Sequence, residues 1–294
     1  MTASTILRLC RPKQWVKNLF VFLPLFFSGN ILNLHKLAAG MIAFVSFSLI
    51  SSAIYCMNDI VDVESDRKHP QKRMRPVASG EVSRGGAMRL MCVLCMLSVG
   101  ITFFLPLTEC LRTAGVVLIY MILNIAYCLA LKRVALLDVA VISFGFVLRI
   151  VAGGMATDIF ISHWIVLMTF LLALFLALSK RRDDILIYER TGEKMRKNIL
   201  RYNLEFMSQS TTMVATVMLV CYIMYTVSPE VVERFKSGRV YVTSLFVLIG
   251  LLRYMQLTVV DSSTGSPTRT LLHDRFIQLC LLCWVITFFI IIYL

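Results

Sequence analysis

Residues 58–76 read N-D-I-V-D-V-E-S-D-R-K-H-P-Q-K-R-M-R-P and directly follow a long apolar run. If the helix predicted for that run continues, Asn58, Asp62 and Asp66 recur every four residues, and Asp59 precedes Asp62 by three. Side chains at these spacings share one face of a helix. The stretch therefore predicts a helical face of carboxylate and amide oxygens at the end of a hydrophobic segment.

Oxygen ligands of this kind predict a site for a hard divalent cation. Stacked like charges destabilise a bare helix, so the carboxylates require a compensating cation. Mg2+ commonly uses one or two carboxylates and completes its shell with water and substrate phosphates. We therefore take Asn58, Asp59, Asp62 and Asp66 as candidate metal ligands, and Asp62 and Asp66 also as candidate catalytic residues.

A basic run begins at Arg67, directly after the acidic residues. Its members Lys72, Arg73 and Arg75 are suited to hold phosphate charge beside the metal. The alternative is a solvated loop of mixed charge between two helices, because alternating charge usually indicates exposure. The regular acidic spacing and the two prolines of the stretch favour a site.

Composition assigns the chain to the membrane proteins. Its 294 residues are 58% hydrophobic and 16% charged, with a mean hydropathy of +0.78. In hydrocarbon every backbone polar group must be satisfied internally, so apolar runs of helical length predict an all-α bundle. We expect one polytopic domain, residues 1–294, with about nine transmembrane helices; eight remains open because Lys17, Asn30 and Asn33 interrupt the first. The spans are predicted near residues 18–34, 37–57, 88–107, 111–130, 134–156, 161–179, 205–227, 240–257 and 275–294.

The net charge of +13 follows membrane topology and does not indicate nucleic-acid binding. With nine spans, most of the 30 Lys and Arg residues fall at the N-terminus and in alternate loops, which the positive-inside rule places in the cytoplasm. We expect a cytoplasmic active site under the loops 58–87, 131–138 and 180–204. The charged segment that ends near Arg201 is predicted to form a surface cap.

Two ionisable residues, Asp138 and Arg149, lie within the fifth predicted span. Such residues are costly in a bilayer and usually face a polar cavity, so each is a candidate site residue. They are eleven residues apart, about three turns, which predicts a shared helix face. The alternative for Asp138 is pairing with Lys132 or Arg133 at headgroup level, and for Arg149 a salt bridge or carbonyl clamp between helices.

The sixth span is predicted to end at the basic residues Lys180 and Arg181. The positive-inside rule alone accounts for positive charge at this place. A cytoplasmic phosphate contact is the other interpretation, because Lys132 and Arg133 border the same side of the membrane.

The pattern N-D-x-x-D-x-x-x-D resembles the UbiA prenyltransferase superfamily, and further motifs make nearly the whole chain similar to its decaprenyl-phosphate phosphoribosyltransferase branch. These motifs are R-P-K-Q-W-V-K-N at residues 11–18, D-R-x-H-P-x-K-R-x-R-P at 66–76, Y-x-x-x-L-K at 127–132 and D-V-x-x-x-x-x-G-F-V-L-R at 138–149. The resemblance implies a nine-helix bundle in a bacterial plasma membrane, with Mg2+ and a diphosphate held under cytoplasmic loops.

The activity that the resemblance implies is Mg2+-dependent transfer of 5-phosphoribosyl from phosphoribosyl pyrophosphate to a polyprenyl phosphate, with release of diphosphate. Asp138 then becomes a candidate catalytic residue that contacts ribose hydroxyls or a second ion. Membrane lipids are expected around the chain, and a homo-oligomer remains open. The candidate substrate-binding residues are Lys17, Lys72, Arg73, Arg75, Tyr127, Lys132, Arg149, Lys180 and Arg181.

One departure from the superfamily pattern bears on the donor. Enzymes that use prenyl diphosphates typically carry a second D-x-x-x-D motif, whereas here Asp138 is followed at that spacing by Ile142. This favours a donor with one diphosphate and an additional phosphate. The alternatives are an aromatic prenyltransferase, which moves a polyprenyl group from its diphosphate to an aromatic acid, and a transporter whose carboxylates form an ion pathway. Clustering of charge at one membrane face disfavours the transporter.

Overall fold

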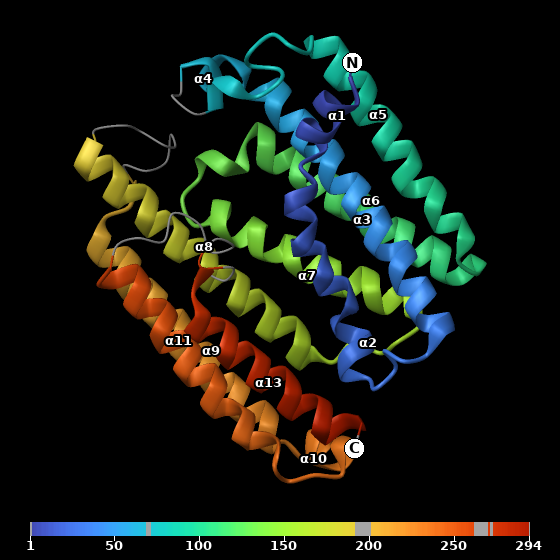
Figure 1. Ribbon diagram of the computed structural model, residues 1–294, viewed down its shortest axis with the longest axis vertical. Helices are drawn as coiled ribbons and strands as arrows, with labels where there is room; N and C mark the ends of the chain where they lie inside the picture. The colour runs from blue at the N-terminus through green and yellow to red at the C-terminus, as the bar shows by residue number, and fades with distance from the viewer. Residues whose placement is uncertain (1, 69–71, 192–200, 262–269, 271–272, 294) are drawn as a thin grey trace. The chain divides into compact units, whose positions relative to one another are not determined.

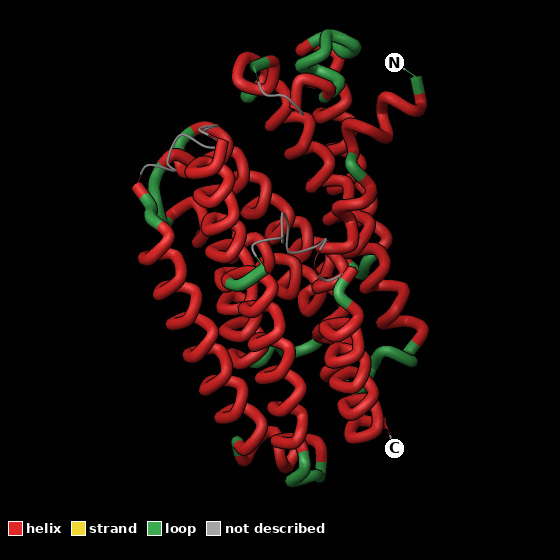
Figure 2. Tube along the Cα trace, turned by 60° about the vertical axis from the view of Figure 1, so that its left-hand side comes forward, coloured by secondary structure: helices red, strands yellow, loops and turns green. Residues whose placement is uncertain are grey.

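The computed structural model describes residues 2–68, 72–191, 201–261, 270 and 273–293. Within these ranges the chain is helical and contains no strand (Figure 2), which confirms the predicted all-α class. Residues 69–71 of the acidic and basic stretch lie outside the described residues, as do residues 192–200 of the predicted surface cap.

Eight helices of the described chain are long and apolar enough to cross a membrane, and they coincide with the predicted spans after the first. Large apolar side chains such as Phe103, Phe104 and Leu111 are exposed on them, as expected for helices surrounded by lipid. The helices are α3 (Leu34–Val61), α5 (Arg84–Gly100) with η3 (Ile101–Phe104), α6 (Leu107–Leu129), α7 (Leu137–Thr157), α8 (His163–Thr191), α9 (Leu204–Val227), η6 (Val240–Val242) with α11 (Thr243–Val259), and α13 (Arg275–Tyr293) (Figure 1).

The segment expected to form the first span, residues 18–34, is not a single α-helix. It contains the last five residues of a 3-10 helix, η1 (Pro12–Phe22), and a short α-helix, α2 (Leu23–Phe27). A 3-10 helix rises about 2.0 Å per residue and an α-helix about 1.5 Å. Laid end to end, the 11 residues of η1 and the 5 of α2 therefore extend about 30 Å, the thickness of the hydrocarbon core.

The chain divides into two compact units, and the first comprises Met1–Lys132 and Phe144–Ile161. In this unit α3 packs against α5, α6 and η1, and the short α1 (Ala3–Cys10) lies along α3 (Figure 1). Small side chains permit the close approach of α3 and α5. Ser46 Oγ donates to Ser98 O and Ser98 Oγ to Ser46 O, each at 2.8 Å, so two buried hydroxyls join the helices.

Polar contacts fasten η1 to α3 in the same unit. Trp15 Nε1 donates to Ser52 Oγ and Asn18 Nδ2 to Ser48 Oγ, both at 3.0 Å. The α3 hydroxyls in turn donate to carbonyl oxygens of their own helix. A buried hydrogen bond is costly to leave unmade, so these contacts fix the register of η1 against α3.

The second unit comprises Arg133–Ser143 and Ser162–Leu294. Here α8 packs along α9, and α11 contacts both α9 and α13, around a core that includes Phe175, Met207 and Tyr254. The helix α8 continues through the basic cluster to Thr191, past residue 179, where the sixth span was predicted to end. Between α9 and η6 lies the short α10 (Pro229–Phe235).

Candidate active site

The acidic motif lies where α3 ends and α4 (Val63–Arg67) begins. The predicted continuous helix is interrupted at Asp62, whose backbone (φ −94°, ψ 5°) leaves the helical region. The Asp62 N–H still donates to Asn58 O at 2.9 Å, and α4 resumes at the next residue. The break divides the motif between two sets of partners instead of one stacked face.

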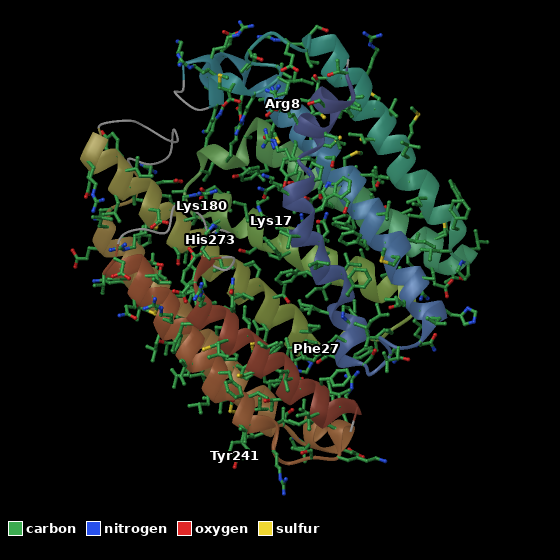
Figure 3. The ribbon with its side chains drawn as sticks, viewed as in Figure 1. Arg8, Lys17, Phe27, Lys180, Tyr241 and His273 are labelled. Carbon is green, nitrogen blue, oxygen red and sulfur yellow. The ribbon has the colours of Figure 1, made fainter. Side chains whose placement is uncertain are left out.

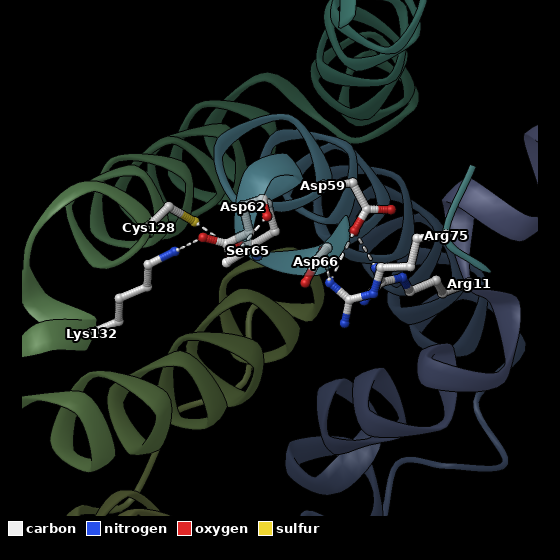
Figure 4. A network of polar contacts seen from close by, with 9 residues as sticks. Arg11, Asp59, Asp62, Ser65, Asp66, Arg75, Cys128 and Lys132 are labelled. Carbon is white, nitrogen blue, oxygen red and sulfur yellow. Dashed lines mark hydrogen bonds and ion pairs between the residues drawn. The ribbon is translucent and has the colours of Figure 1, made fainter. Parts of the chain in front are cut away.

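The first set joins Asn58 and Asp62 to the end of α6 (Figure 4). Lys132 Nζ lies 2.5 Å from Asp62 Oδ1, and the Cys128 thiol donates to Asn58 Oδ1 at 3.0 Å. Asn58 and Asp62 are four residues apart, as are Cys128 and Lys132, so contacts at this spacing join the end of α3 to the end of α6 and the 3-10 helix that follows it, η4 (Leu131–Arg133). Lys132 is thereby placed as a cation directly on the acidic motif.

The second set joins Asp59 and Asp66 to two arginines (Figure 4). Arg75 Nη1 lies 2.7 Å from Asp66 Oδ2 and 3.4 Å from Asp59 Oδ1, and Arg11 Nη2 pairs with the same oxygen of Asp59. Both carboxylates are buried. Arg75 thus bridges the two acids, and the predicted proximity of base to acid is present in the first unit.

The acidic residues fit a hard cation by their chemistry, although they are not assembled around one centre. Among the described residues, no group of three or more His, Cys, Asp or Glu side chains is close enough to hold a metal ion. However, Asp59 Oδ2 is buried and has no hydrogen-bond partner in the described part of the chain. An unsatisfied buried carboxylate oxygen is costly. Oxygen donors with such an orphan suit Mg2+.

The other basic candidates of the first unit have varied exposure. Lys17 lies on η1 (Figure 3) and is half-buried, as are Lys72 on η2 (Lys72–Met74) and Tyr127 on α6. Arg73 is exposed. Their roles toward substrate stay predictions.

Asp138 lies at the start of α7, in the second unit, where it is fully buried. Its Oδ2 accepts from Arg181 Nε at 2.6 Å and its Oδ1 from the Tyr202 hydroxyl at 2.9 Å. The same Tyr202 oxygen accepts from the Leu136 N–H at 2.6 Å. Burial raises the pKa of Tyr202 to about 12, so the phenol stays protonated and donates. Asp138 therefore pairs with Arg181 and Tyr202, and not with Lys132 or Arg133 as the alternative expected.

Arg181 and its neighbour Lys180 occupy a helical part of α8 (Figure 3). Arg181 is buried, also contacts Asp184 at 3.3 Å, and leaves Nη2 without a hydrogen-bond partner among the described residues. An ion pair this deeply buried is expensive to form and is weak evidence for stability.

Arg149, the other ionisable residue of α7, has a different set of partners. Nε donates to Asn18 Oδ1 and Nη1 to Gly145 O, each at 2.7 Å, and Nη2 donates to the Tyr120 hydroxyl at 3.1 Å. This is the clamp between helices that the sequence left as an alternative to substrate binding. Asp138 and Arg149 were predicted to share a helix face, but the hydrogen-bond partners of the two side chains are different.

Three partners in these networks were not predicted. Arg11 was considered only as the first residue of the motif at residues 11–18, and Cys128 and Tyr202 were given no role. A signal for Cys128 was present, because it lies four residues before Lys132, as Asn58 does before Asp62. No local pattern links Tyr202 to Asp138, since they are 64 residues apart.

Comparison with known proteins assigns this chain to a family. The sequence matches the UbiA prenyltransferase family over residues 19–292. It is 35% identical over 292 residues to a decaprenyl-phosphate phosphoribosyltransferase of Mycolicibacterium smegmatis, covering 96% of this chain and 90% of that one. A protein of the same name from Corynebacterium glutamicum is 34% identical over 294 residues, covering 99% and 88%.

The fold comparison agrees. A UbiA homologue from Archaeoglobus fulgidus, whose structure was solved with GPP and Mg2+, superposes with a TM-score of 0.68 at 18% identity, covering 99% of this chain and all of that one. At that identity the likeness concerns the fold. The family match and the relatives extend over nearly the whole chain. The chain therefore belongs to the UbiA prenyltransferase family.

Proposed function

We propose that this integral membrane protein transfers a 5-phosphoribosyl group from phosphoribosyl pyrophosphate to a polyprenyl phosphate in an Mg2+-dependent reaction. The bond between ribose C1 and the diphosphate oxygen breaks, and a bond forms between C1 and a phosphate oxygen of the lipid. Diphosphate leaves with the electron pair of the broken bond. The lipid phosphate is already an anion, so no general base is needed.

Asn58, Asp59, Asp62 and Asp66 would hold the metal ion. When bound, Mg2+ neutralises charge that develops on the leaving diphosphate. The support is the orphan oxygen of Asp59 together with an all-oxygen donor set. Asp62 Oδ1 lies 2.5 Å from Lys132 Nζ, a cation that can also contact phosphate.

Basic side chains would bind the donor and acceptor phosphates and stabilise the charge of the transition state. Lys132 and Arg75 are the best supported, because each already contacts a carboxylate of the motif. The work of the protein is then orientation and charge stabilisation. We assign Lys17, Lys72, Arg73, Tyr127, Lys180 and Arg181 to the same task, and the N-terminus and acidic motif to the cytoplasmic side.

The observation that carries the choice of donor is the state of Asp138. Both of its carboxylate oxygens are engaged, one by Arg181 and one by Tyr202. A second metal site of the D-x-x-x-D kind would need this carboxylate together with another four residues on, and that position is Ile142. The guanidinium of Arg181 and the hydroxyl of Tyr202 beside Asp138 instead suit contact with ribose hydroxyls.

A donor competition in detergent tests the proposal. Purified protein receives polyprenyl phosphate, Mg2+ and radiolabelled phosphoribosyl pyrophosphate; a parallel reaction contains a prenyl diphosphate and an aromatic acid. We expect label to move from the ribosyl donor into the lipid phase. Prenylation of the aromatic acid instead would establish the other reaction of this fold, and inactivity in both would contradict an enzyme of either kind.

A further inference from the structure

We propose that Arg11 is a placeholder cation, which occupies the acidic motif until Mg2+ and a diphosphate bind together, and which then binds the diphosphate. The inference rests on the proposed function, because it concerns the same metal and the same leaving group. It assigns to Arg11 a positioning role in diphosphate binding and predicts that metal and diphosphate bind cooperatively.

The charges of the cluster are balanced in the absence of metal. Two guanidinium groups, of Arg11 and Arg75, lie against two buried carboxylates, of Asp59 and Asp66. Both arginines converge on one oxygen, Asp59 Oδ1, and the other oxygen has no hydrogen-bond partner in the described chain. One oxygen of Asp59 therefore holds two cations and the other holds none among the described residues. A divalent ion bound to the free oxygen would change how the arginines are shared.

The backbone of Arg11 supplies an independent observation. This residue ends α1 and precedes η1 in the left-handed region, with φ 51° and ψ 59°. That conformation is uncommon for residues other than glycine, asparagine and aspartate, and it costs free energy. Strained residues of this kind persist at functional sites, where the surroundings hold them in place. Arg11 caps the C-terminus of α1, where its N–H donates to the Leu7 carbonyl, and its guanidinium lies on Asp59 and over the ring of Tyr55, 5.0 Å from its centroid.

Arg11 is also placed to exchange partners. The side chains of Arg11 and Arg75 are 26% and 27% exposed, whereas that of Asp59 is 1% exposed. A divalent ion at Asp59 would add two positive charges to a neutral and largely buried cluster, and like charges at such distances repel strongly. A diphosphate anion restores the balance and accepts charge-assisted hydrogen bonds from guanidinium groups. A metal ion that binds without diphosphate must therefore compete with Arg11 for Asp59. A metal ion that binds together with diphosphate need not, because the diphosphate binds the displaced Arg11.

The test measures two affinities in one variant, Arg11→Asn. Asparagine tolerates the left-handed backbone, so the substitution removes the charge and leaves the turn between α1 and η1. Binding of Mn2+ without substrate, followed by electron paramagnetic resonance, should become tighter. Binding of labelled phosphoribosyl pyrophosphate at saturating Mg2+ should become weaker. Coupling of this kind commonly corresponds to a change of about 5-fold to 150-fold.

Arg8→Gln is the matched control, because Arg8 lies on the same α1 helix but bonds Glu81 and the Met74 carbonyl instead of the acidic motif. We expect neither affinity to change in it. If both affinities fall in Arg11→Asn, or if Mn2+ binding is unchanged, the placeholder role is refuted. Should Arg11→Asn not fold, Arg11→Gly makes the same test, since glycine also accepts the left-handed backbone and removes the same charge.

The two proposals fail in distinguishable ways. Wild-type protein that binds no phosphoribosyl pyrophosphate contradicts the proposed function, whatever Arg11 does. Wild-type protein that binds it, with Mn2+ and donor affinities that move together in Arg11→Asn, contradicts the placeholder alone.

Discussion

Nε of Arg149 donates a 2.7 Å hydrogen bond to Oδ1 of Asn18, which lies 131 residues earlier in the chain. The described hydrogen-bond acceptors of this buried guanidinium are all uncharged, and aromatic rings of Phe47, Tyr120 and Phe146 lie 5.1 to 5.7 Å from its central carbon. Carbonyl, amide and hydroxyl dipoles and the ring faces therefore hold the charge. Arg149 joins η1, α6 and α7 within the first unit.

Replacement of Arg149 by methionine should reduce stability more than it reduces substrate affinity. The change leaves the Asn18 amide oxygen buried without its donor, and one unsatisfied group of this kind costs about 1–3 kcal/mol. Thermal unfolding in detergent, read beside binding of phosphoribosyl pyrophosphate by the protein that remains folded, separates the two effects. Arg112→Met is the control, because Arg112 forms an exposed pair with Asp158. An unchanged unfolding temperature with lost binding would restore the substrate-binding role.

Gly153 is required where α7 passes η1. A Cβ at this position would lie 1.9 Å from the Val21 carbonyl oxygen, which is backbone and cannot rotate away. Overpacking of a core typically costs about 1–3 kcal/mol, and a clash with backbone lies at the upper end or beyond. We expect Gly153→Ala to lower the yield of folded protein and its unfolding temperature. Gly145→Ala on the same helix should be tolerated, because its Cβ would make ordinary contacts at 3.5 and 3.6 Å. Equal behaviour of the two variants would contradict this packing.

The parts of the fold that the sequence predicted are those set by local geometry. Apolar runs of helical length predicted α3 and the later spans. The acidic spacing also predicted that Asn58 and Asp62 share neighbours, because residues four apart face the same side of a helix.

The parts that could not be predicted depend on contacts between distant residues. Hydropathy does not distinguish a 3-10 helix from an α-helix, so the geometry of η1 was missed. The division of the acidic motif follows from Lys132 and Arg11, which lie 70 and 48 residues from their carboxylates. Likewise α8 continues past Lys180 because a charged sequence still forms a helix when its arginines find partners, as Arg182 does at the Thr258 carbonyl.

Tyr202→Phe should impair both stability and turnover. The substitution removes the hydroxyl that donates to Asp138 Oδ1 and that accepts from the Leu136 N–H. Each partner left unsatisfied costs about 1–3 kcal/mol, and Asp138 loses one of the two contacts that orient it. Because the pKa of Tyr202 is raised to about 12, the wild-type protein should show no loss of activity from this phenol near pH 10. Tyr241→Phe, which changes an exposed tyrosine, is the control. Unchanged turnover in Tyr202→Phe would remove Tyr202 from the site.

Acid should release α1 from the loop before α5. Hydrogen bonds from the Thr5 hydroxyl, at 2.5 Å, and from Arg8 hold the pKa of Glu81 below its ordinary value of 4.5. A lowered pKa in the folded state means that the contact is fully present above pH 4.5 and is lost as pH falls through the lower folded value. Protection of the α1 amides, which is the intrinsic exchange rate divided by the measured rate at the same pH, should therefore fall as the pH is lowered below 4.5. Glu81→Gln should show low protection both above and below that pH, and unchanged protection of the wild type would contradict the contact.

Asp62→Asn and Asp66→Asn should each nearly abolish turnover while the protein stays folded. Either change removes one negative charge from the motif but retains an oxygen, so the loss falls on metal and phosphate binding and not on packing. Transition-state stabilisation by a metal ion is worth several kcal/mol, which corresponds to a fall of about 100-fold or more. A titration with Mg2+, followed by ribosyl transfer, measures the loss. Glu64→Gln is the matched control: it removes the same charge two residues from Asp62, but its carboxylate is exposed and pairs at the surface with Arg84 at 2.6 Å. Full activity in both aspartate variants, or equal loss in Glu64→Gln, would mean that the motif contributes general negative charge and no specific metal ligand.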